Sequence, residues 1–135
     1  PEGQWAAGVF IETPTRVVLV SEVLGITPIL KKVPGGRRRP ADATVADTAV
    51  REAFEETGIR ISKEELGTPG AFDRKGHTYY LFHVKVSEDR LEGRYTVAKN
   101  GEEVHVLTHA ELKADEKGVL GHHRSMLRTR CLWPA

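Results

Sequence analysis

The sequence predicts a single α+β domain in which strands flank one central helix along the chain. Extended runs rich in β-branched and aromatic residues occupy Trp5–Ile11 and Arg16–Val20, with a turn signal between them. A capped amphipathic segment follows Thr44, and alternating apolar residues return at Tyr80. The 135 residues, 39% of them hydrophobic, suffice for one core and leave no room for a second domain, so we expect one domain over residues 1–135.

Composition restricts the possible partners. Twenty Lys and Arg against nineteen Asp and Glu give a net charge of +1, which argues against a nucleic acid or an anionic membrane as partner. No apolar run approaches the ~18 residues of a membrane span, and no secretory signal follows Pro1. The single cysteine, Cys131, cannot form an internal disulfide and is expected to be a buried or half-buried apolar residue. A cytoplasmic location is therefore expected.

Further strands are assigned from alternation and turn signals. Ile26–Val33 is expected to follow the first two strands as a neighbour in the sheet. Within Gly70–Val86, apolar side chains alternate with others from Tyr80 onward. In Glu102–Leu107 the valines at alternate positions face one way, which is typical of a strand.

Two segments complete the outline of the fold. Apolar residues at helical spacing predict a helix over Gly118–Cys131 that packs on the sheet. The charged segment Ser87–Gly101, with two glycines, is predicted to be a mobile surface loop.

The central helix is predicted over Val45–Thr57. Thr44 is a suitable N-cap, Asp47 completes a short-armed capping box, and Gly58 stands where a left-handed C-terminal cap is wanted. Apolar residues at steps of three and four define the face expected to pack on the sheet: Ala46, Ala49, Val50, Ala53, Phe54 and Thr57.

Like charges gather on this helix. Glu52, Glu55 and Glu56 are predicted to project from the side opposite the apolar face. The i, i+4 pair among them costs a few tenths of a kcal/mol, and Arg51 and Arg60 can offset only part of the repulsion. A hard divalent cation such as Mg²⁺ would complete the cluster, since it prefers oxygen ligands. A solvated acidic face is the alternative, and the helix alone does not decide between them.

The segment before the helix favours the cation. Gly35 and Gly36 allow a tight turn and a close approach of the backbone to a ligand. Arg37, Arg38 and Arg39 follow and add positive charge. Exposed amides and arginines beside a carboxylate-bound cation could grip a diphosphate, so these five residues are candidates for substrate binding. A solvated loop or a weak nucleic-acid patch is the alternative for the arginine run.

Residues 35–59 resemble the Nudix box of the Nudix hydrolases. The positions that match in type and spacing are Arg51, Glu52, Glu55, Glu56, Gly58 and Ile59. The first half departs from the pattern, because Asp42 replaces a glutamate and one extra residue precedes Arg51. The resemblance implies the Nudix fold, a mixed β-sheet sandwiched between α-helices.

The resemblance also implies a reaction: metal-dependent hydrolysis of a phosphoanhydride in a nucleoside diphosphate linked to another moiety X. The implied metal ligands for Mg²⁺, or alternatively Mn²⁺, are Glu52, Glu55 and Glu56. Arg51 would orient one of them, and either Glu52 or a downstream residue, Glu102 or Glu103, would be the general base. The partner would be a nucleotide-type small molecule, and the protein a monomer or homodimer.

Other interpretations stay open. Because of the loop departures, a catalytically weak or inactive Nudix-like module that binds a nucleotide or a protein partner is the main alternative. His105 and His109 invite a zinc site, but they lack the glutamate of a zinc-protease helix. Strand aromatics such as Tyr79 and Tyr80 could stack a base, although core packing is the more common role of such residues. The sequence does not identify the substrate.

Overall fold

The computed structural model describes residues 4–21, 30–92 and 103–135. Within them seven strands form one sheet in the order β3-β2-β1-β6-β5, with β4 paired to β1 and β7 paired to β2. The strands are β1 (Trp5–Glu12), β2 (Arg16–Ser21), β3 (Lys31–Lys32), β4 (Gly35–Arg37), β5 (Gly70–Arg74), β6 (His77–Lys85) and β7 (Glu103–Thr108). The α-helices are α1 (Val45–Thr57), α2 (His109–Ala114) and α3 (Gly121–Thr129). Short 3₁₀ helices cover Lys63–Glu65, Glu88–Leu91 and Glu116–Gly118.

Strand β1 is the centre of the sheet. It runs parallel to β6 along its whole length, and its other edge pairs antiparallel with β4 near the start and with β2 near the end. The sheet is therefore mixed. Because β4 lies beside the first half of β1, the segment before α1 is fixed to the middle of the molecule.

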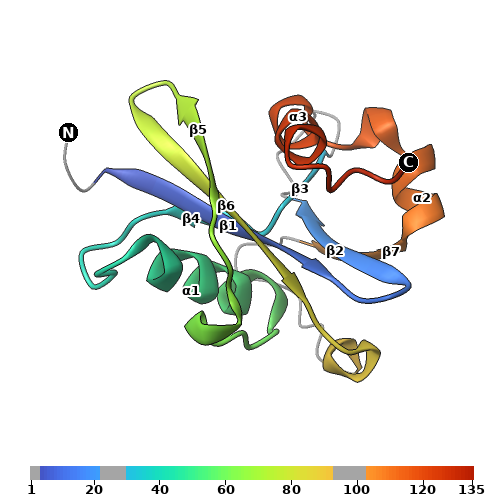
Figure 1. Ribbon diagram of the computed structural model, residues 1–135, viewed down its shortest axis with the longest axis horizontal. Coiled ribbons are helices and arrows are strands. Elements are labelled where there is room, and N and C mark those ends of the chain that lie inside the picture. Colours follow the sequence, from blue (N-terminus) through green and yellow to red (C-terminus); the bar gives the residue numbers. More distant parts are fainter. Residues whose placement is uncertain (1–3, 22–29, 93–102) are drawn as a thin grey trace.

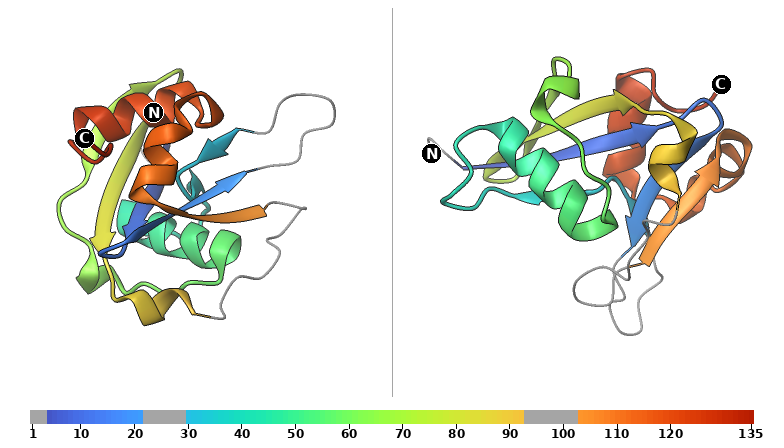
Figure 2. Two further views of the ribbon diagram at one scale, coloured as in Figure 1. Left: turned by 90° about the vertical axis from the view of Figure 1, so that its right-hand side faces the viewer. Right: turned by 90° about the horizontal axis from the view of Figure 1, so that it is seen from below.

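Helices cover both faces of the sheet (Figure 1). Helix α1 lies on one face and α2 and α3 lie on the other, which is clearest from the side in Figure 2. Successive β1 side chains alternate between the two cores: Ala7, Val9 and Ile11 pack on the α1 side, and Ala6 and Phe10 on the α3 side. The predicted mixed sheet between helices is confirmed.

Helix α1 has the predicted boundaries and caps. The Thr44 side chain accepts from the Asp47 backbone N–H, the Asp47 carboxylate accepts from the Thr44 N–H, and Gly58 has φ 77°. The packing face differs in two places. Phe54 is 40% exposed and lies under Arg60, because it stands ~140° around the helix from buried Ala49.

Glu56 is the second difference, and it corrects the prediction that all three glutamates oppose the packing face. At seven residues from Ala49 it returns to within ~20° of that residue's direction. Its side chain is accordingly buried against the sheet, with 6% of the residue exposed.

Several predicted boundaries were wrong near the chain's turns. In the described part of Ile26–Val33 only Lys31–Lys32 is a strand, whereas the expected loop at Gly35–Arg37 is strand β4. Gly70–Val86 is a hairpin that turns at Gly76, where φ is 83°. The start of Ser87–Gly101 is a 3₁₀ helix with a buried Leu91, and residues 93–101 lie outside the described residues.

The C-terminal helix is shorter than the spacing predicted. It begins at Gly121 and ends at Thr129, although Met126 and Leu127 pack on the sheet as expected. Cys131 follows the helix end with φ 58°, so its side chain leaves the helical face and is exposed. The prediction of a buried or half-buried cysteine was wrong. Within the described residues, no helix is long and apolar enough to cross a membrane.

Candidate active site

Glu56 is fixed to the backbone of β4. Its Oε1 accepts a hydrogen bond from the Gly35 N–H at 2.7 Å, and its Oε2 lies 3.8 Å from Lys32 Nζ. A buried carboxylate is costly unless donors and a countercharge compensate it, and here both are present. The glutamate therefore has one fixed orientation beside the glycine pair.

Gly35 and Gly36, the glycine pair, are needed because other side chains lie close to their backbone, and not because the chain turns there. Neither Gly35 nor Gly36 has a positive φ, so the predicted tight turn was wrong. A Cβ built on Gly36 would lie 2.7 Å from the carboxylate carbon of Glu52, and one on Gly35 would lie 2.6 Å from the Tyr79 hydroxyl. The missing side chains let Glu52 and Tyr79 approach the strand backbone.

Arg51 is the countercharge at the centre of the acidic group. Its Nη1 donates to Glu52 Oε1 at 3.0 Å and to Glu55 Oε1 at 3.1 Å. Its Nε and Nη2 donate to the two carboxylate oxygens of Asp42 at 3.0 and 2.8 Å. One guanidinium thus joins the helix to the preceding loop through a bidentate pair.

Asp42 anchors that loop. Its carboxylate also accepts from the Arg39 backbone N–H at 3.0 Å and from the Thr48 hydroxyl at 2.8 Å, and the residue is 4% exposed. The hydrogen bonds from Arg51 outweigh the effect of burial and hold the pKa of Asp42 well below its ordinary value. Asp42 stands where the Nudix-box pattern has a glutamate, and its carboxylate still links the loop to helix α1 through hydrogen bonds.

This pairing predicts a specific pH dependence of stability. Since folding lowers the pKa of Asp42, its contribution to the free energy of unfolding is fully present above the unfolded pKa of about 3.9 and is lost as the pH falls through the lower folded value. We expect Asp42→Asn to be about 2 kcal/mol less stable than wild type at pH 7. The difference should shrink between about pH 4 and 2, measured by urea unfolding at several pH values. A constant difference would contradict the charge interaction.

The remaining arginines of the predicted substrate group divide between different partners. Arg39 Nη1 donates to Glu55 Oε2 at 2.9 Å. Arg38 stacks over the Trp5 ring at 4.6 Å and donates to the Asp42 carbonyl. Arg37 alone of these three lines a cleft, described below. Substrate contacts by Arg38 and Arg39 stay predictions.

The carboxylates suit a hard cation in kind but are ion-paired here. In the described ranges, no group of three or more His, Cys, Asp or Glu side chains is arranged to hold a metal ion. Glu52, Glu55 and Glu56 provide only oxygen donors, which is the ligand type that Mg²⁺ prefers. Both Glu55 oxygens accept a hydrogen bond from an arginine, so a cation bound by all three glutamates would share the Glu55 carboxylate with Arg39 and Arg51.

A basic cleft of about 200 Å³ opens beside the glycine pair. Its lining comes from β1, β3, β4, the β5–β6 hairpin and α3: Ala6, Lys32, Gly35, Gly36, Arg37, Arg74, His77, Tyr79, His122 and His123. Of its cations, Arg37 lies on β4, the strand that holds Glu56, and Lys32 Nζ lies 3.8 Å from Glu56 Oε2, so the site combines carboxylates with positive charge at close range. Such a combination suits a polyanion and a cation bound together.

The sequence did not reveal the far side of this cleft. On that side His123, from α3, is 5% exposed. Its Nδ1 accepts from the Val33 N–H at 3.1 Å, and burial, aided by nearby cations and His122, lowers its pKa to about 3. His123 is therefore neutral at pH 7 and supports the wall of the cleft. No spacing signal links α3 to the glycine pair.

The other predicted residues lie elsewhere. Glu103 starts β7, is exposed, and pairs in register with Ser21 of β2. Glu102 lies outside the described residues. His105 Nε2 hydrogen-bonds with the Ser21 hydroxyl, and His109 Nε2 with a Glu12 oxygen, both at 2.7 Å. The two histidines of the zinc interpretation thus have different partners.

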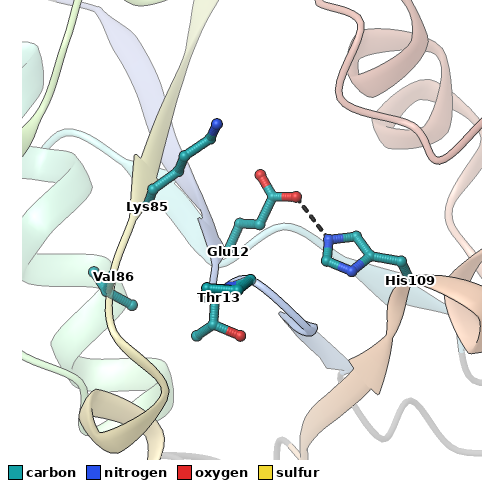
Figure 3. Close-up of a pocket in the computed structure, with 6 residues that line it drawn as sticks. Glu12, Thr13, Lys85, Val86 and His109 are labelled. Carbon is teal, nitrogen blue, oxygen red and sulfur yellow. Dashed lines mark hydrogen bonds and ion pairs between the residues drawn. The ribbon is translucent and has the colours of Figure 1, made fainter.

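A second hollow lies at the other end of β1. Figure 3 shows the Glu12 carboxylate directed toward His109, with Lys85 at the end of the neighbouring strand β6 and Val86 directly after it. Its volume is about 490 Å³. Glu12 also pairs with His83 at 2.7 Å, and although burial opposes it, hydrogen bonding to both histidines lowers the pKa of Glu12. The box glutamates do not line this pocket.

Comparison with known proteins finds a matching family model and two curated relatives. The family model described as NUDIX domain matches residues 3–129. The protein named nucleoside diphosphate-linked moiety X motif 6 is 38% identical over 73 residues in Mus musculus, covering 49% of this chain and 23% of that protein. The human protein of the same name is 35% identical over 86 residues, covering 58% and 27%. The chain spans about a quarter of the length of these curated relatives.

Solved structures share the fold at low sequence identity. A NUDIX hydrolase from Nitrosomonas europaea superposes with a TM-score of 0.68 at 21% identity, covering 98% of this chain and 91% of that one. A bifunctional NMN adenylyltransferase/ADP-ribose pyrophosphatase from Francisella tularensis, complexed with AMP and a manganese ion, gives a TM-score of 0.75 at 17% identity. That match covers 94% of this chain and 41% of the other.

Proposed function

Because the chain belongs to the Nudix family, we propose that it hydrolyses a phosphoanhydride bond in a nucleoside diphosphate linked to another moiety X. The observation that carries this proposal is the position of Glu52 and Glu56 against the backbone of Gly35 and Gly36, beside a basic cleft. Phosphoanhydride hydrolysis needs an anionic substrate held beside carboxylates. The basic cleft would hold the anion, and Glu52 and Glu56 provide the carboxylates.

The relatives support the substrate class and the cofactor. Two of them are named for nucleoside diphosphates linked to a moiety X, and one structural neighbour is an ADP-ribose pyrophosphatase with AMP and manganese bound. We propose that this chain uses Mg²⁺, or Mn²⁺ in its place, held by Glu52, Glu55 and Glu56. The bound cation would neutralise the phosphoryl oxygens and make a water molecule more acidic.

The chain's own groups divide the remaining tasks. Arg51 keeps Glu52 and Glu55 oriented, since it donates to both from one nitrogen. Gly35, Gly36 and Arg37 form the floor on which the diphosphate would lie, with the Arg37 guanidinium as a counterion. The Gly35 N–H keeps Glu56 from rotating away.

Glu52, which lies against Gly36, is proposed to be the general base, and Glu103, at the exposed start of β7, is the downstream alternative. We expect Glu103→Gln to leave kcat and metal affinity unchanged, whereas loss of a base that is not a ligand would lower kcat about a hundred-fold at unchanged metal affinity, since a base acts on the water and not on the cation. Glu52→Gln should lower both, because Glu52 is also a proposed ligand. Steady-state kinetics and Mn²⁺ titration monitored by electron paramagnetic resonance would separate the two. An unchanged kcat in Glu103→Gln would assign the base to Glu52.

The proposed function is tested with a substrate panel. Nucleoside triphosphates, nucleotide sugars, ADP-ribose and dinucleoside polyphosphates are each incubated with the protein and Mg²⁺, and released phosphomonoester is quantified. The expected result is turnover of at least one substrate, which EDTA abolishes and added Mg²⁺ restores. Absence of product from every substrate, together with ligand binding by calorimetry, would instead identify a binding module.

A further inference from the structure

Two buried donors in the cleft have no partner. Among the residues that the structure describes, the buried side-chain nitrogen and oxygen atoms without a hydrogen bond are Arg74 Nε and the Tyr79 hydroxyl oxygen. Both residues line the same basic cleft. Buried polar groups in folded proteins are nearly always hydrogen-bonded, because an orphaned group loses its water without compensation. Because both orphaned atoms belong to residues of one cleft, a ligand bound there is the partner that would satisfy them.

Packing alone does not explain the position of the Tyr79 hydroxyl. Tyr79 is 7% exposed, and a Cβ on Gly8 of β1 or on Gly35 of β4 would collide with its oxygen. Two strands thus lack side chains where the phenol lies. A phenylalanine would fill nearly the same space in this core, so the hydroxyl itself needs another reason.

The hydroxyl remains a donor over the whole physiological range. Burial raises the pKa of Tyr79 well above its ordinary value, and the negative charges of Glu56 and Glu52 raise it further. A protonated phenol can donate one hydrogen bond. The Nη atoms of Arg74 donate to the carbonyls of Asp73 and His122, which holds the guanidinium plane across the cleft.

Charge and size define the ligand. Lys32, Arg37 and Arg74 line the same cleft as Tyr79, so the preferred ligand is anionic, and phosphate oxygens suit this set of donors. A volume of about 200 Å³ is below the ~300 Å³ at which pockets for drug-sized ligands begin. The size of the cleft therefore matches a phosphorylated fragment better than a whole nucleotide.

We propose that the cleft between β4, the β5–β6 hairpin and α3 binds the phosphate-bearing moiety X, a phosphosugar-sized group, with the Tyr79 hydroxyl and Arg74 Nε–H donating to its oxygens. The assignment of this fragment to X rests on the proposed function. Recognition of a phosphorylated fragment does not depend on turnover. Tyr79 is thus a binding residue, and the half of the substrate that leaves as a phosphomonoester would occupy this cleft.

The test compares two tyrosines that are adjacent on β6. Tyr79→Phe removes only the hydroxyl in the cleft, and Tyr80→Phe is the matched control, since Tyr80 packs toward the core on the α1 face. Ribose 5-phosphate, inorganic phosphate and adenosine are titrated by calorimetry without divalent cations, and thermal unfolding is recorded for each variant. Arg74→Lys is a second variant that keeps the charge and loses Nε.

We expect ribose 5-phosphate to bind wild type and Tyr80→Phe equally and to bind Tyr79→Phe about ten-fold more weakly. The Tm of Tyr79→Phe should be unchanged or higher, because an orphaned buried hydroxyl has been removed. Arg74→Lys should also bind more weakly, and adenosine should not bind. A purely structural hydroxyl would lower the Tm on removal and leave binding unchanged, which would overturn the proposal.

The remaining outcomes separate this proposal from the proposed function. Turnover in wild type without any binding of ribose 5-phosphate or phosphate would overturn the phosphate cleft and leave the hydrolase in place. Tyr79-dependent binding without turnover of any substrate would support the cleft and overturn the hydrolase. Inorganic phosphate binding as tightly as ribose 5-phosphate would overturn the assignment of the sugar to this space.

Discussion

Glu56→Gln is expected to lower kcat/KM at least about a hundred-fold while the protein stays folded. The carboxylate charge is what a cation or a developing positive centre requires, and the amide removes it without changing the side chain's length. The Gln oxygen can still accept from the Gly35 N–H, which now meets Glu56 Oε1 at 2.7 Å. Activity and urea unfolding are measured on the same preparation.

Glu64→Gln is the matched control. Glu64 lies in the 3₁₀ helix Lys63–Glu65 and is exposed, so loss of its charge should alter neither activity nor stability. Turnover by Glu56→Gln at the wild-type rate would remove Glu56 from the catalytic group. A large loss of stability in Glu56→Gln would show that the mutation damages the fold and not only the site.

Arg51→Met is expected to lower the free energy of unfolding by about 3 kcal/mol and to abolish activity. The variant leaves Asp42 buried without its bidentate partner and frees Glu52 and Glu55 to repel each other. This loss arises because the Asp42 charge stays buried without a partner. Its free-energy cost exceeds the free energy that an ion pair at the surface contributes. Urea unfolding monitored by Trp fluorescence gives the stability, and Arg51→Lys provides a milder variant that keeps the charge.

Arg60→Met is the control for removal of an arginine. Arg60 is exposed and stacks over the Phe54 ring at 4.1 Å, so its loss should cost less than about 1 kcal/mol. The double variant Asp42→Asn, Arg51→Met should be more stable than the sum of the single effects implies, because the pair shares one interaction. Strict additivity would contradict the coupling of helix and loop through this pair.

The best-predicted part of the fold is α1, because its signals are local. Thr44, Asp47 and Gly58 act within a turn of the helix ends, so the boundaries at Val45 and Thr57 followed from the sequence alone. The orientation of Glu56 was not predicted correctly. The three glutamates were placed on one face because they share a charge, although the angular position of Glu56 around the helix axis puts it on the buried face. Tertiary contact with Gly35 makes that burial tolerable.

The site was predictable only where it is continuous in sequence. The glutamates, Arg51 and the glycine pair lie within one segment, and its resemblance to a known motif identified them. Tyr79, Arg74 and His123 reach the same cleft through strand pairing and the packing of α3, which no short-range pattern encodes. The β4 strand was missed for the same reason, because its pairing partner β1 lies far away along the chain.

The most direct test of phosphoanhydride hydrolysis is mass spectrometry of the products formed in ¹⁸O-labelled water with Mg²⁺. ADP-ribose and a nucleotide sugar serve as substrates, with the Glu56→Gln protein as the blank. We expect two phosphomonoester products, one of which carries a single label from water, formed only by wild type and only with the cation. Unlabelled products, or label incorporation that persists in Glu56→Gln, would contradict this expectation.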